Sequence, residues 1–73
     1  MELHWEDGFE SRVRVEDGEA RISANAEGLR SLAKHLLALA EERPGSHLHL
    51  DPYNSLEADS APLLLERIKE DGT

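Results

Sequence analysis

Two histidines and an aspartate, His47, His49 and Asp51, have the residue types and spacing of a possible metal site. They alternate with Leu48 and Leu50, and alternate residues of a β-strand point off the same face of a sheet. Imidazole and carboxylate groups are common zinc ligands. A strand over this stretch would therefore present three potential ligands side by side.

The metal interpretation has little support beyond that spacing. The run resembles part of the His-x-His-x-Asp-His signature of metallo-β-lactamase-fold hydrolases, but Pro52 stands where that signature has its last histidine, and 73 residues are too few for that fold. A fourth ligand would have to be His4 or His35. We therefore expect no metal and no cofactor, and we interpret the two histidines as the solvated face of a half-buried strand.

Covalent and acid–base catalysis are also weakly supported. The sequence has no cysteine, and its serines lack the glycine-elbow context of an activated nucleophile. Acidic pairs occur, such as Glu41 with Glu42, but a chain this short rarely encloses the dry pocket that shifts the pKa of a carboxyl group. We predict that the protein is not an enzyme.

The charge balance bears on the class of partner. Sixteen acidic and eight basic residues give a net charge of −8, which repels nucleic acid and anionic membranes and attracts a basic protein. The absence of cysteine suits a reducing compartment, and no apolar run approaches the length that spans a bilayer. We expect one domain over residues 1–73, located in the cytoplasm, that binds neither nucleic acid nor membrane.

Two Asp-Gly pairs, at 7–8 and 17–18, divide the first third of the chain into three strand-like runs. At the second pair a two-residue turn places Val13 opposite Ile22, so the apolar residues of both runs share one face. At the first pair a two-residue turn gives poor pairing, and we expect a bulged or longer turn.

From Asn25 onward the apolar period changes from two to 3.6 residues, which predicts an amphipathic helix over residues 26–42. Asn25 is a suitable N-cap, and the run "RPGS" ends the helix. The apolar stripe consists of Leu29, Leu32, Ala33, Leu36, Leu37 and Ala40.

After the helix the sequence predicts a strand at "HLHLD", a loop from Pro52 to about Ala61, and a last strand at "LLLERI". The expected fold is α+β: a single-layer antiparallel sheet, in the order β-β-β-α-β-β, with the helix packed on one face. The expected core is Leu3, Trp5, Val13, Val15, Ile22, Leu29, Leu32, Leu36, Leu48, Leu50 and Ile68.

Arg12, Arg14 and Arg21 share the non-core face of the predicted hairpin. Three arginines could grip a phosphate or a carboxylate. Interleaved glutamates favour a salt-bridged, solvated face instead.

The loop "DPYNSLEADS" is the most unusual segment, since it combines a rigid start, one tyrosine, an amide, hydroxyls and three acids. Tyrosine in a polar surround is typical of protein interfaces. Leu56 is expected to fold back over the core, whereas Tyr53 could either do so or point to solvent. The expected partner-binding residues are Asp51, Tyr53, Asn54, Glu57 and Asp59, with Glu41 and Glu42 as weaker candidates.

The runs "SANAEGLRSLAKHLL" and "SHLHLDPYNSLE" resemble immunity protein family thirty-two of bacterial polymorphic toxin systems, and the resemblance extends over residues 22–68. It implies a protein that binds a cognate toxin and blocks it. The charge of −8 fits a basic toxin such as a nuclease. The alternative is a small structural or regulatory module, for instance a homodimer, that self-associates through exposed sheet edges.

Overall fold

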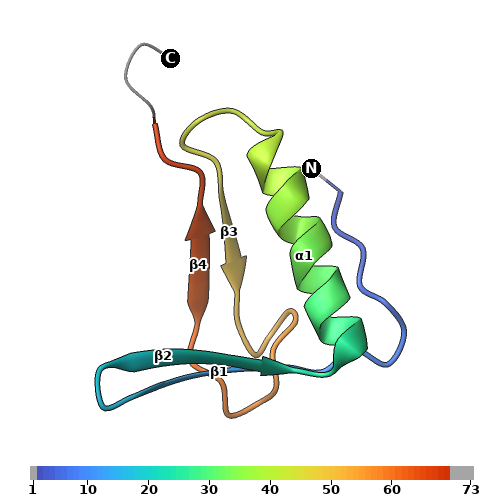
Figure 1. Ribbon diagram of the computed structural model, residues 1–73, viewed down its shortest axis with the longest axis vertical. Helices are drawn as coiled ribbons and strands as arrows, with labels where there is room; N and C mark the ends of the chain where they lie inside the picture. The colour runs from blue at the N-terminus through green and yellow to red at the C-terminus, as the bar shows by residue number, and fades with distance from the viewer. Residues whose placement is uncertain (1, 70–73) are drawn as a thin grey trace.

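The computed structural model describes residues 2–69 and is α+β, as the sequence predicts. The elements are β1 (Ser11–Glu16), β2 (Glu19–Ala24), α1 (Ala26–Ala40), β3 (His47–Leu50) and β4 (Leu63–Glu66). The strands form two separate antiparallel pairs, β1–β2 and β3–β4, so the expected single sheet is wrong. In Figure 1 the β1–β2 hairpin runs across one end of the β3–β4 pair.

The β1–β2 hairpin has the predicted register. Val13 pairs with Ile22 and Val15 with Ala20. Asp17 and Gly18 at the turn have φ values of 50° and 78°, which is the left-handed pair that a two-residue hairpin turn requires. The parity of the apolar residues therefore determined the pairing correctly.

The expected first strand is wrong, because residues 2–10 form no strand in the structure. The turn at Asp7-Gly8 has two central residues, since Phe9 N donates to Glu6 O at 3.1 Å, so the expected bulged or longer turn is wrong. The backbone before it bonds helix side chains: Glu6 N donates to Ser31 Oγ at 2.8 Å, and His35 Nε2 donates to His4 O at 3.1 Å. Those contacts take the place of a ladder to β1.

Helix α1 begins after the predicted N-cap. Asn25 Oδ1 accepts from Gly28 N at 2.8 Å and from Glu10 N at 3.0 Å, while Asn25 Nδ2 donates to Gly8 O at 2.9 Å. One carboxamide thus caps the helix and holds residues 8–10 against its first turn. The helix ends at Ala40, two residues earlier than expected.

The face of α1 that is buried differs from the prediction. Its buried residues are Gly28, Ser31, His35 and Leu39, which lie roughly a third of a turn from the centre of the leucine stripe. Gly28 lets the helix approach the backbone of Glu10, and Ser31 and His35 find partners in residues 4–6. The helix packs through small and polar residues, and much of its leucine stripe faces outward.

The core is correspondingly smaller than expected. Of the predicted members, Val13, Leu48 and Leu50 are buried, and Leu3, Trp5 and Leu32 are half-buried. The remaining five are exposed, and their assignment to the core is wrong: Val15, Ile22, Leu29, Leu36 and Ile68. Leu39 and Leu56 are buried in addition.

The thin overall shape follows from how α1 lies. Figure 1 shows α1 beside β3, with the N-terminal segment on its other side, so the helix does not cover the β3–β4 pair in this view. The principal extents are 39 × 32 × 20 Å. The expectation that the helix packs on one face of a sheet is therefore wrong. The helix lies beside the strands, and together they form a thin plate.

The close approach at Gly28 predicts a reversal of normal helix propensity. A Cβ at this position would overlap Glu10 O and lie 2.9 Å from Ser11 Oγ. Glycine to alanine inside a helix ordinarily stabilises by up to about 1 kcal/mol, but Gly28→Ala should destabilise by about 1–3 kcal/mol because the backbone contact must open. Urea unfolding measures the difference. Ala33→Gly, at an exposed site of the same helix, supplies the ordinary cost, and a stabilised Gly28→Ala would contradict the packing.

Burial of His35 predicts a pH-dependent stability. The side chain is 1% exposed, and desolvation, together with the nearby His4, lowers its pKa below 6.5 despite the hydrogen bond to the His4 carbonyl. The unfolded chain therefore binds this proton more readily than the folded chain does. The contribution of His35 to stability is fully present above pH 6.5 and is lost as the pH falls through the lower pKa of the folded state.

Melting temperatures measured between about pH 8 and pH 5 test this dependence. The pKa values of Glu6 and Asp59 are also lowered, from 4.5 and 3.8, so their contributions fall away only at lower pH. His47→Gln, at an exposed strand position, should keep the slope, whereas His35→Gln should flatten it. If the melting temperature depended on pH equally in both variants, the pH dependence would not come from His35.

Candidate partner-binding loop

The loop between β3 and β4 begins with a tightly bonded turn. Asp51 O accepts from the backbone amides of Asn54, Ser55 and Leu56. The Asp51 carboxylate accepts from Tyr53 N at 2.9 Å and from Asn54 N at 3.1 Å, and Asn54 returns the bond by accepting from Asp51 N. These bonds form an Asx-type turn, and Asn54 Nδ2 ties it to β3 by donating to His49 O at 2.9 Å.

Tyr53 and Leu56 take opposite positions from this turn. Leu56 is 7% exposed and joins Val13 and Leu50 in the core, as expected. Tyr53 is 99% exposed, so it does not serve as a lid. The buried leucine anchors the turn while the phenol ring projects into solvent.

The second half of the loop is bonded to β1. Glu57 N donates to Ser11 O and Ala61 N donates to Val13 O, both at 2.8 Å, while Ser60 Oγ accepts from Val13 N at 3.1 Å. These bonds occupy the edge of β1 that faces away from β2. The loop is therefore held at both ends and covers a strand edge.

Asp59 is engaged within the protein. Arg12 Nε donates to Asp59 Oδ1 at 2.9 Å, and Arg14 forms a second ion pair with Asp59 Oδ2. The hydrogen bond from Arg12 is the main cause of a lowered pKa of Asp59. Its charge is neutralised locally, which leaves Glu57 as the acid of this half-loop with no ion pair among the described residues.

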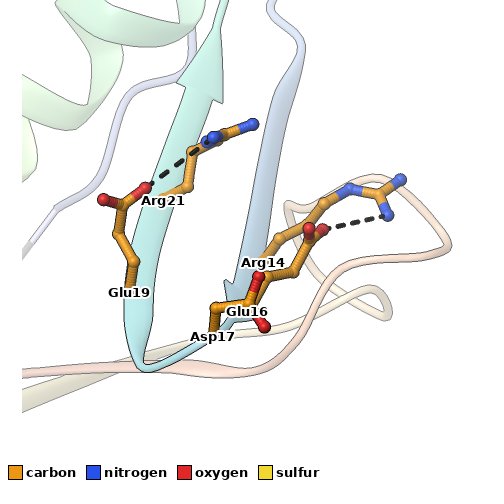
Figure 2. A pocket seen from close by; sticks show the side chains of 5 residues that line it. All are labelled: Arg14, Glu16, Asp17, Glu19 and Arg21. Atoms are coloured by element: carbon orange, nitrogen blue, oxygen red, sulfur yellow. Dashed lines mark ion pairs between the residues drawn. The ribbon is translucent and has the colours of Figure 1, made fainter.

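The arginine face of the hairpin is salt-bridged, in agreement with the favoured interpretation. A hollow of about 230 Å³ is lined by Arg14, Arg21 and three acids, Glu16, Asp17 and Glu19. Figure 2 shows these five side chains and the ion pairs between them. Arg21 lies 3.7 Å from Glu19, and Arg14 lies 4.0 Å from Glu16. Carboxylates outnumber guanidinium groups here, so the hollow is poorly suited to bind an anion.

The weaker candidates lie away from the loop. Glu41 is the C-cap of α1 and is exposed, and Glu42 is half-buried with its carbonyl accepting from Arg67. In Figure 1 this helix end and the turn at residues 51–56 are at opposite ends of β3. The structure thus joins Asp51, Tyr53 and Asn54 in one turn. Glu57 and Asp59 lie on the half of the loop that is bonded to β1, and Glu41 and Glu42 are separated from the loop.

The histidines of the possible metal motif are exposed, as expected for a solvated strand face. The rings of His47 and His49 are 5.0 Å apart and perpendicular. Asp51 lies beyond the strand, and its carboxylate is bonded to the turn. Over residues 2–69 no group of three or more His, Cys, Asp or Glu side chains is arranged to hold a metal.

Metal removal should accordingly leave the protein unchanged. We expect EDTA, His47→Ala and His49→Ala each to shift the melting temperature little. Both histidines are exposed, so neither ring contributes to the core. Elemental analysis of protein purified without an affinity tag is the complementary measurement. Stoichiometric zinc or nickel would refute the expectation.

The comparisons with known proteins give one match. A family model described as Immunity protein 32 matches residues 19–68, a range that starts at the first residue of β2 and includes the candidate loop. Searches of curated proteins and of solved structures give no match.

Proposed function

We propose that this chain, which belongs to the Immunity protein 32 family, binds a toxin protein and neutralises it through the loop at residues 51–59. The sequence resemblance to this family is confirmed by the family match. An immunity protein acts by binding, which agrees with the expectation that the chain is not an enzyme.

The observation that supports the loop most directly is the position of Tyr53. A tyrosine that is 99% exposed on a turn whose backbone is already bonded can insert into a partner with little ordering cost. Tyrosine is also among the residues that most often dominate binding energy at interfaces. The burial of Leu56 and the bonds to β1 keep the loop in place.

Charge supports a basic partner. The net charge of −8 favours encounter with a positively charged protein, such as a nuclease whose own surface attracts nucleic acid. Glu57 contributes to this attraction from the same loop as Tyr53, whereas Asp59 is offset by Arg12 and Arg14. The proposed site of action is the cytoplasm. Within the described part of the chain, no helix is long and apolar enough to cross a membrane.

Surface plasmon resonance against the purified product of the adjacent gene tests the anchor. Tyr53→Ala should speed dissociation and cost about 2 kcal/mol or more of binding free energy, because the complex loses a ring that binding would bury. Tyr53→Phe keeps the ring and should retain most of the affinity. Neither change should affect folding, since the side chain is fully exposed.

The same assay at two salt concentrations tests the charge. Glu57→Gln should slow association and weaken its salt dependence. Glu19→Gln changes the net charge equally, but on the β1–β2 hairpin, and should have the smaller effect. Wild-type kinetics for both Tyr53→Ala and Glu57→Gln would exclude the loop as the interface.

A further inference from the structure

We call five apolar residues the apolar face, three of them exposed and two, Leu32 and Leu63, half-buried: Ile22, Leu29, Leu32, Leu36 and Leu63. Ile22, Leu32 and Leu63 line one hollow between the hairpin, the helix and β4. Leu29 and Leu36 lie one helical turn on either side of Leu32. Ile22, Leu29 and Leu36 are 43%, 53% and 46% exposed.

The hollow within the apolar face reaches the core. Val13, Leu50, Leu56 and Trp5 also line it, and Ser11 is the one polar residue of the lining. The three aliphatic residues of that group are the buried cluster of the domain. The buried core thus lies directly beneath this face, where Val13, Leu50 and Leu56 are 2%, 4% and 7% exposed.

The charges of α1 are kept away from the apolar face. Arg30 and Lys34 both bind the carboxylate of Glu6 on the N-terminal segment, and Arg30 also pairs with Glu27. These residues lie on a different side of the helix from the leucine stripe. A chain with a net charge of −8 thus has a surface on which two copies could meet without acids of α1 facing each other.

The chain exposes more surface than a compact monomer of its mass. Its accessible area is 5335 Å², whereas a compact protein of 8.2 kDa exposes about 4500 Å². Its radius of gyration is 13.0 Å, against about 11 Å for a compact chain of 73 residues. The chain is therefore less compact than a typical monomer of its size, which leaves apolar side chains at the surface.

We propose that the apolar face binds the apolar face of a second copy of this chain, in a dimer with two-fold symmetry. Domains below about 70–80 residues have a small core and are often supplemented by a disulfide, a metal or oligomerisation. The sequence has no cysteine, and residues 2–69 have no metal cluster. Pairing through the outer edge of β1 is closed, because the loop already bonds it. The proposal is independent of toxin binding.

Sedimentation equilibrium of the full chain over a wide concentration range tests the dimer. The wild type should have twice the monomer mass of 8.2 kDa, and its melting temperature should rise with protein concentration. Leu29→Glu should raise the dimer dissociation constant by about 30-fold or more, as expected for a central interface residue. Leu64→Glu is the matched control, since Leu64 is 54% exposed but pairs with the outward-facing His49.

A second variant covers the case in which Leu29→Glu does not fold. Ala33→Arg adds bulk and charge to an exposed position of the same stripe without removing a side chain that packs in the monomer, and it should also dissociate the dimer. A wild type of monomer mass at all concentrations would overturn the proposal. A dimer that is dissociated by Leu64→Glu but not by Leu29→Glu would also overturn it. The same holds if the wild type is a monomer and Leu29→Glu lowers its affinity for the adjacent gene product, because the apolar face would then bind that product.

Discussion

The side chain of Asn25 joins three parts of the fold. Its oxygen accepts from the first turn of α1 and from Glu10, and its amide donates to Gly8. Because the same group caps the helix and binds the segment before β1, the helix cannot turn about its axis without losing these bonds. Gly28, one turn further on, then faces the backbone of Glu10, and Ser31 and His35 follow on the same side.

This docking explains why the leucines of α1 face outward. Hydrophobic burial would favour the stripe at about 25 cal/mol per Å², but rotating it inward would require the polar partners of Ser31 and His35 to be abandoned. Their bonds to Glu6 N and His4 O are partly buried, and leaving such groups unpaired costs about 1–3 kcal/mol each. Several specific polar contacts thus fix an orientation that apolar area alone would not select.

The sequence predicted features that depend on local pattern. The register of β1 with β2 followed from parity, the helix start followed from Asn25, and the outward histidines of β3 followed from alternation with leucine. Periodicity also identified which helix residues share a face, but it does not say which face contacts the protein. That choice depended on Gly28 and on residues 4–6, whose partners lie about 24–31 positions away in the chain. The ion pairs of Asp59 with Arg12 and Arg14 span 47 and 45 positions and had no local signal either.

The loop at residues 51–61 has a structural task besides any contact with a partner. By bonding Ser11 and Val13 it occupies the open edge of β1, and an unoccupied edge is a template for adding strands from other molecules. Substitutions that loosen the loop would therefore expose this edge and reduce solubility. The inner side of this segment is thus constrained by protection against aggregation, whereas a fully exposed side chain such as Tyr53 is free of that constraint.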